Sequence, residues 1–305
     1  MHRHCLFPIL LHLSLLGGAH AVVVATGDGT QNTTAPVDDF GFANVGRVFN
    51  TKDGFFNSGV YLGHGWVLTA YHVVRDGSGG FLFGDVVFGS TTFAATPASG
   101  VRLQNADTTF TDLALFQLTV EPISLAAVTI ASALPSLNSA ITMVGNGQDR
   151  ETSVTQWNVD GSNVWTEGGV PPYERSGYKE LQGNQSVRWG TNTIESGPSI
   201  LNVGFGNLTT FVTDFDNTAN EAQGSPGDSG GAVFYKNGAT WELIGIVDAT
   251  ASYIGQPDFT AVFGDLTYAA SLPTYRSQIV ATIPEPGSIT LGLIGAAVLG
   301  WRRRR

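Results

Sequence analysis

The stretch GSPGDSGGA at residues 224–232 contains the clearest chemical signal in the chain. Glycines on both sides of Ser229 allow the backbone to turn tightly, which exposes the serine hydroxyl. Such a turn can also aim successive backbone N–H groups at one point, as an oxyanion site requires. The stretch therefore predicts an exposed serine beside a site that can stabilise negative charge.

Two stretches upstream supply the groups that a nucleophilic serine needs. In WVLTAYHVV, residues 66–74, an apolar strand leads into His72, so the imidazole can face a cleft at the strand's end. In TDLAL, residues 111–115, Asp112 comes directly before an apolar strand. Each residue alone is more typical of a structural role, such as a satisfied core histidine or a turn residue. Together the three stretches give the order His, Asp, Ser.

The order His, Asp, Ser excludes an α/β-hydrolase. GDSGG, residues 227–231, also fits the Gly-x-Ser-x-Gly elbow of α/β-hydrolases, in which the histidine follows the serine. The six histidines are residues 2, 4, 12, 20, 64 and 72, so none follows Ser229. His64 lies in Gly-His-Gly, a pattern that indicates an exposed hairpin turn, and His72 is therefore favoured as the base.

The combined pattern resembles the chymotrypsin-like (trypsin-like) serine protease family over most of residues 40–281. That resemblance implies an all-β fold of two Greek-key six-stranded β-barrels, with the active site in the cleft between them and a short C-terminal helix. The residue pattern indicates the same all-β class independently of the resemblance. Short runs rich in Val, Ile, Phe and Thr, typical of strands, are bounded by the turn residues Gly, Asn, Asp or Ser. Residues 272–279 are the one good helix candidate, with Ser271 as its N-cap.

By the same resemblance, Ser229 is the nucleophile, His72 the general base and later acid, and Asp112 the group that orients the imidazole. The oxyanion hole would consist of the backbone N–H groups of Gly227 and Ser229. The implied mechanism needs no metal or cofactor. The expected substrate-binding residues are Gln223, Asp248, Ala249 and Thr250.

The sequence departs from the family pattern at two acids. Asp248 stands where the family often has a serine beside the catalytic aspartate, and two neighbouring carboxylates raise one pKa or require an extra donor. No Ile-Val-Gly-Gly start is visible upstream of Val45, so the sequence identifies neither a partner for Asp228 nor an activation route. The single cysteine, Cys5, excludes a disulfide framework.

The N-terminal 21 residues are typical of a secretory signal peptide, with a basic start, an apolar stretch and a small-x-small cleavage site at 19–21. The mature chain would begin at Val22 with a flexible lead-in over residues 22–37. We expect the protease domain over residues 38–281, with a surface insertion at about 145–183. An N-terminal membrane anchor is the less favoured alternative, because the apolar run is short.

Residues 282–305 resemble the PEP-CTERM sorting tail of bacterial envelope proteins. Pro-Glu-Pro at 284–286 precedes an apolar segment, 289–301, and then four arginines. As a helix that segment reaches about 20 Å, less than the ~30 Å hydrocarbon core. We therefore expect transient contact with the inner membrane, with the arginines on the cytoplasmic side, and processing by an exosortase-type enzyme. An ordinary tail anchor is the alternative.

The formal net charge of −10 argues against nucleic acid as a partner. The sequence as a whole predicts a secreted bacterial serine endopeptidase of the cell envelope, which hydrolyses protein or peptide substrates through an acyl-enzyme. Two alternatives stay open. One is a catalytically inactive family member used as a binding module, and the other is an envelope or matrix structural protein.

Overall fold

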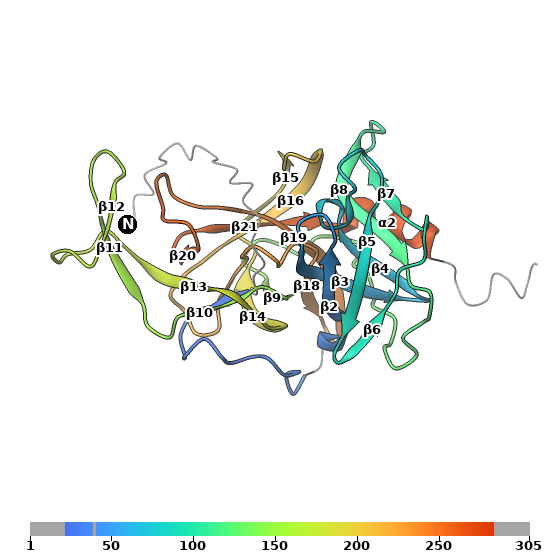
Figure 1. Ribbon diagram of the computed structural model, residues 1–305, viewed down its shortest axis with the longest axis horizontal. Coiled ribbons are helices and arrows are strands. Elements are labelled where there is room, and N and C mark those ends of the chain that lie inside the picture. Colours follow the sequence, from blue (N-terminus) through green and yellow to red (C-terminus); the bar gives the residue numbers. More distant parts are fainter. Residues whose placement is uncertain (1–21, 39–40, 284–305) are drawn as a thin grey trace, which may run out of the picture.

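The structure is a computed structural model that describes residues 22–38 and 41–283 (Figure 1). These residues form three larger β-sheets, a two-stranded sheet and short helices. The helices are η1 (Phe42–Asn44), α1 (Tyr71–Val74) and α2 (Leu272–Thr282). The predicted signal peptide, 1–21, and the part of the sorting tail from 284 to 305 lie outside the described residues.

The first seven-stranded sheet comes from the N-terminal half of the chain. Its order is β6-β5-β2-β3-β4-β8-β7. The segment after β6 also reaches β8, because Thr96 N–H donates to Gln117 O at 2.7 Å. The strands are β2 (Val45–Asn50), β3 (Phe55–Gly63), β4 (Trp66–Ala70), β5 (Phe83–Phe88), β6 (Thr91–Phe93), β7 (Val101–Gln104) and β8 (Phe110–Gln117).

The second seven-stranded sheet comes from the C-terminal half. Its order is β14-β9-β18-β19-β21-β16-β15. The residues after β14 also bond to β16, because Glu195 N–H donates to Val212 O at 2.8 Å. The strands are β9 (Ala140–Gly145), β14 (Arg188–Thr193), β15 (Ser196–Asn202), β16 (Asn207–Asp214), β18 (Ala232–Asn237), β19 (Thr240–Ala251) and β21 (Leu266–Ser271).

The all-β class with a short C-terminal helix is confirmed. Each main sheet contains seven paired strands, where the family resemblance implies six. Helix α2 begins at the predicted residue and continues to Thr282, beyond the predicted end at 279.

The segment predicted as a surface insertion, 145–183, folds largely into strands. Its outer end, with β11 and β12, projects from the body of the molecule in Figure 1. Trp157 anchors this part, since it is 1% exposed and meets Trp165 edge to face with ring centroids 5.9 Å apart. The strands of this sheet are β10 (Gln148–Arg150), β11 (Thr155–Val159), β12 (Trp165–Glu167), β13 (Arg175–Gln185) and β20 (Thr260–Val262).

The structure differs from the predicted flexible lead-in at residues 22–25. β1 (Val23–Val24) pairs with β17 (Ala222–Gln223), which places Val23 opposite Gln223. All four residues are at most 1% exposed. Burial of the apolar Val-Val-Val-Ala run lowers the free energy of the folded chain. This holds residues 22–25 in place, although polar residues follow them.

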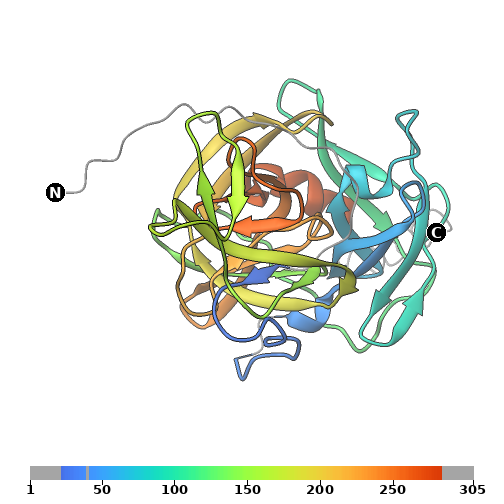
Figure 2. The same cartoon turned by 60° about the vertical axis from the view of Figure 1, so that its left-hand side comes forward.

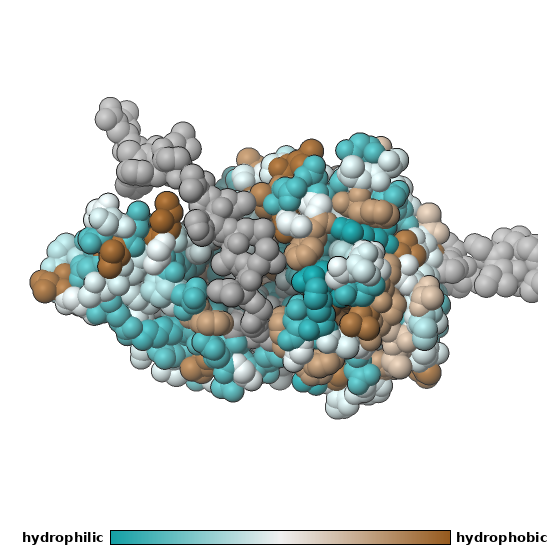
Figure 3. Space-filling view, turned by 45° about the horizontal axis from the view of Figure 1, so that its top comes forward, coloured by the Kyte–Doolittle hydropathy of each residue, from teal (hydrophilic) through white to brown (hydrophobic). Residues whose placement is uncertain are grey.

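The two seven-stranded sheets share one apolar core. Val60 and Leu68 of the first sheet belong to the same cluster as Val144 and Ile246 of the second. Figure 2 shows the blue to green strands of the first sheet beside the green to red strands of the second. On the face shown in Figure 3, hydrophobic residues are scattered among hydrophilic ones. Within residues 22–38 and 41–283, no helix is long and apolar enough to cross a membrane.

Candidate active site

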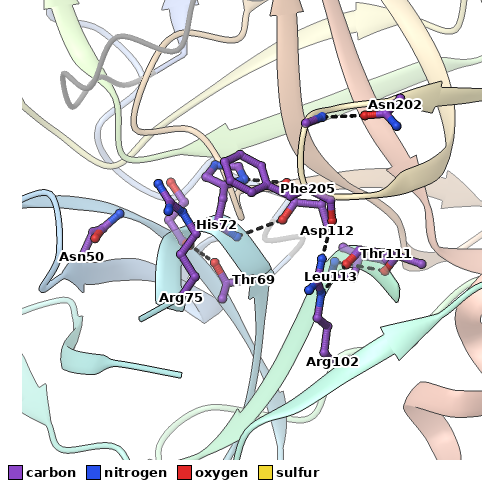
Figure 4. Close-up of polar contacts among 12 residues, drawn as sticks. Asn50, Thr69, His72, Arg75, Arg102, Thr111, Asp112, Leu113, Asn202 and Phe205 are labelled. Carbon is purple, nitrogen blue, oxygen red and sulfur yellow. Dashed lines mark hydrogen bonds and ion pairs between the residues drawn. The ribbon is translucent and has the colours of Figure 1, made fainter. Parts of the chain in front are cut away.

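His72 and Asp112 come from neighbouring strand ends of the first sheet. β4 ends at Ala70, which pairs with Leu113 on β8, and His72 follows in α1. This register brings the side chain of Asp112 to His72 (Figure 4). The His72 backbone N–H donates to Asp112 Oδ1 at 2.8 Å, and His72 Nδ1 lies 2.7 Å from Asp112 Oδ2.

A buried carboxylate that holds both the backbone and the ring of His72 determines where the ring proton lies. Asp112 is 0% exposed, so its partners are protein groups rather than bulk water. When Nδ1–H is donated to Asp112, the neutral ring keeps the lone pair of Nε2 available. His72 is therefore arranged to take up and return a proton at Nε2.

The loop with Ser229 is fixed to the first sheet by Ser58 of β3. Ser58 N–H donates to Ser229 O at 3.0 Å, and the Ser58 hydroxyl donates to Gly227 O at 2.8 Å. The same hydroxyl accepts from Asn146 N–H at 2.8 Å. Thr69 Oγ1 donates to Ser58 O at 2.7 Å. Because Thr69 is on β4, these contacts hold the serine loop beside the strand that leads into α1.

Two glycines shape the turn around Ser229. Gly227 has φ +96° and Gly230 has φ +87°, left-handed values that favour glycine. A Cβ at Gly230 would lie 2.1 Å from Ser58 O, so no side chain fits there. In the described part of the chain, the N–H groups of Gly227 and Ser229 donate to no protein acceptor. These are the two N–H groups expected to form the oxyanion hole.

Asp228, next to Ser229, is completely buried. Its Oδ2 accepts from Ser225 N–H at 2.9 Å, while its Oδ1 has no hydrogen-bond partner among the described residues. Burial raises the pKa of this carboxyl well above its ordinary value, and the Ser225 N–H, the Arg188 guanidinium and the Val22 N–H each lower it. Val22 therefore faces Asp228, the acid for which the sequence identifies no partner.

Asp248, expected in the substrate pocket, lies beside Asp112. One ligand atom from each of His72, Asp112 and Asp248 lies within 4.8 Å of the other two. Asp248 is 6% exposed, and neither of its oxygens has a hydrogen-bond partner among the described residues. Burial, and secondarily the charge of Asp112, raises the pKa of Asp248 well above its ordinary value.

Among the described residues, two groups of side chains have the ligand types and spacing for a divalent metal. They are His72 with Asp112 and Asp248, and Asp214 with Asp216 and Glu221. In the first group, Asp112 Oδ1 already accepts from the His72 backbone N–H, and Asp112 Oδ2 is already bonded to His72 Nδ1. The free oxygens there belong to Asp248, so this arrangement favours a shared proton over a metal.

The other residues expected to bind substrate lie close to the serine loop in the sequence or on β19. Gln223 is 2% exposed. Its Nε2 donates to Leu266 O at 3.2 Å, and its Oε1 accepts from Thr267 Oγ1 at 3.1 Å. Ala249 and Thr250 are half-buried on β19. The Gln223 amide is thus held by neutral partners.

Sequence reasoning missed two residues near these groups. Phe205, between β15 and β16, stacks on His72 with ring centroids 5.3 Å apart and planes at 27° (Figure 4). The Arg75 guanidinium lies 4.8 Å from the Phe205 centroid. Burial raises the pKa of Glu180 on β13 to about 7, although the neighbouring Ser225 side chain lowers it. Neither Phe205 nor Glu180 belongs to a motif that could have indicated it.

The all-β fold with the Ser229 loop set against β3 and β4 is that of a peptidase-type domain, and comparison with known proteins names the family. The chain belongs to the trypsin-like peptidase domain family, whose model matches residues 57–246. Residues 282–305 match the PEP-CTERM protein-sorting motif. No curated protein matches the chain significantly.

Two solved structures are similar at a distance. The Rv3671c protease in its inactive form is 15% identical, with a TM-score of 0.43, over 87% of this chain and 99% of that chain. A serine-to-alanine mutant of Rv3671c from M. tuberculosis H37Rv, also in an inactive form, is 15% identical with a TM-score of 0.42 over the same shares.

Proposed function

We propose that the protein is a serine endopeptidase in which Ser229 is the nucleophile, His72 the general base and Asp112 the group that orients it. The observation that carries the proposal is the double attachment of His72 to Asp112, through the backbone N–H at 2.8 Å and through Nδ1 at 2.7 Å. Membership of the trypsin-like peptidase domain family supports the same reaction class.

The chemistry follows from these atoms. The Ser229 hydroxyl attacks the scissile carbonyl and gives its proton to His72 Nε2, while Asp112 stabilises the imidazolium. The N–H groups of Gly227 and Ser229 stabilise the oxyanion, each by about 3 kcal/mol in comparable sites. His72 then protonates the leaving amine, and water, deprotonated by His72, hydrolyses the acyl-enzyme ester. Ser229 regains its proton at the end of the cycle.

The proposed primary pocket is formed by Gln223 with Ala249 and Thr250. Because Gln223 is neutral and bonded to neutral partners, the base of the pocket offers no counter-charge to a buried cation. A cation without such a counter-charge loses several kcal/mol of hydration. Cleavage after Arg or Lys is therefore disfavoured in this proposal.

The PEP-CTERM motif indicates export toward the cell envelope. We propose that residues 1–21 are a signal peptide, that the mature chain begins at Val22, and that an exosortase-type enzyme processes the tail. The burial of residues 22–25 supports this start, because it gives the new N-terminus a fixed place. Val22 then presents its α-ammonium to the carboxyl of Asp228, which its N–H already faces.

Fluorophosphonate labelling of the mature, exported protein tests the proposal, since only an activated serine reacts readily. We expect labelling and peptide hydrolysis in the wild type, loss of both in Ser229→Ala, and no loss in Ser90→Ala, which changes an exposed serine. A correctly folded wild type that neither labels nor hydrolyses peptides would return the protein to the inactive binding module or the structural role.

A further inference from the structure

The backbone of β19 places a carboxyl oxygen of Asp248 within 4.8 Å of one from Asp112. In the pairing of β19 with β21, Val247 is opposite Ala269 and Ala249 is opposite Tyr268, so Asp248 is the additional residue of a β-bulge. Bulges beside functional sites re-aim a side chain that a regular ladder would direct elsewhere. The bulge thus accounts for a carboxyl group that is 6% exposed and lies next to another buried acid.

The hydrogen bonds of the two acids differ completely. Asp112 accepts two bonds from His72, at 2.8 and 2.7 Å. Both oxygens of Asp248 lack a partner among the described residues. The charged or titratable groups that face Asp248 are Asp112 from β8 and His72 from α1. Two buried carboxylates this close retain one proton between them, and the unbonded acid is the one that keeps it.

We propose that Asp248 is a neutral carboxylic acid that acts as a positioning residue by donating its O–H to the Asp112 carboxylate. Asp112 would then be held from two sides, by His72 and by Asp248, and the buried pair would carry a single negative charge. The charge that stabilises the imidazolium stays on Asp112, and no proton leaves the pair during the reaction. The role in catalysis rests on the proposed protease function, whereas the protonation state of Asp248 does not.

The pH profile of kcat/KM separates a neutral Asp248 from an ionised one. In Asp248→Asn the amide can still donate to Asp112, so we expect activity within about threefold of the wild type and an unmoved acid limb. If Asp248 were ionised, the substitution would remove a negative charge beside the base and lower the acid limb by about one pH unit. That result would overturn the proposal.

Asp248→Ala removes the donor, and we expect kcat/KM to fall roughly 10- to 100-fold, as for a lost hydrogen bond to a charged group. Asp248→Ser, with a smaller donor, should recover part of the loss. Equal losses in the Ala, Ser and Asn variants would contradict a donor role. Asp214→Asn is the matched control, because Asp214 is a partly buried acid outside the His72–Asp112 pair and should leave both limbs unchanged.

Infrared difference spectroscopy tests the protonation state without any turnover. In the mature protein at neutral pH, the wild type minus Asp248→Asn spectrum should contain the C=O band of a protonated carboxylic acid. A carboxylate band in its place overturns the proposal even if the enzyme is fully active. The carboxylic acid band in a protein that hydrolyses nothing would support the neutral acid and reject only the proposed function. Thermal unfolding confirms that each variant is folded.

Discussion

The ring of Phe205 covers one face of the His72 imidazole, with centroids 5.3 Å apart. Arg102 helps to hold the loop in place, because its guanidinium donates to the Phe205 backbone carbonyl and its Nε donates to Thr111 O at 2.8 Å. A loop between two strands of the second sheet therefore orients a histidine that follows a strand of the first.

Phe205→Ala is expected to lower kcat/KM about 2- to 10-fold, since an aromatic pair contributes about 0.5–1.5 kcal/mol beyond its buried area. We expect the lower kcat/KM because the His72 ring is less restricted without the stacked Phe205 ring. Phe205→Tyr keeps the stack and serves as the matched control. Steady-state kinetics of the three proteins measure the effect, and an alanine variant with wild-type kcat/KM would show that the stack does not orient His72.

Ser58→Ala is expected to reduce both the free energy of unfolding and kcat. The substitution leaves the buried Asn146 N–H and Gly227 carbonyl without their shared partner, at a cost of about 1–3 kcal/mol. It also removes the side-chain bond from β3 to the Ser229 loop and leaves only the backbone bond from Ser58 N–H to Ser229 O. Urea unfolding and kinetics provide the two measurements. A stability loss with unchanged kcat would mean that Ser58 supports the fold without fixing the loop.

The sequence predicted the parts of the site that lie in local motifs. His72 follows β4 and Asp112 lies near the start of β8, and antiparallel pairing of those strands brings the two residues together. The contact between Ser58 and Gly227 joins positions 169 residues apart, and no local pattern encodes it. The same holds for Phe205 and for the buried Val22. The place of Asp248 depends on a bulge, and a shift of register by one residue would direct its side chain elsewhere.

Stability is expected to fall as pH rises, because burial raises the pKa of several acids. Burial raises the pKa of Asp265 from 3.8 to about 7, although Gln256 and the Val262 N–H lower it. The folded chain then binds a proton that the unfolded chain has lost, so this contribution is complete below the unfolded value and disappears as pH rises through about 7. The melting temperature of Asp265→Asn should depend less on pH than that of the wild type.

The exposed control Asp85→Asn should keep the wild-type slope of melting temperature against pH. An unchanged slope in Asp265→Asn would mean that other acids cause the pH dependence. Glu180 is the next candidate, because burial raises its pKa to about 7 as well.

Gln223→Asp is expected to increase cleavage after Arg and Lys relative to the wild type, because it adds a negative charge at the base of the proposed pocket. The wild type itself should disfavour basic residues before the scissile bond. A peptide-library profile measures both. A wild-type profile dominated by Arg and Lys would contradict the assignment and implicate Glu180, which lies near Ser225, and Glu180→Gln would then remove the preference.

Intact-mass measurement of the protein from its native host is expected to give a chain that begins at Val22 and has lost the arginines at 302–305. The burial of residues 22–25 and the PEP-CTERM match at 282–305 lead to this expectation. Recovery of a chain that ends at Arg305 would contradict processing by a sorting enzyme and favour an ordinary tail anchor.

In the proposed protease, the pairing of β1 with β17 connects the formation of the proposed N-terminus at Val22 to the state of the Ser229 loop. β17 runs directly into the loop that contains Asp228 and Ser229, and β1 is the strand that starts one residue after the proposed new terminus. A precursor with its leader attached has no free ammonium at Val22 to neutralise the buried acid. The proposed protease would then become active only after translocation, and the cytoplasmic proteins of the producing cell would not be cleaved.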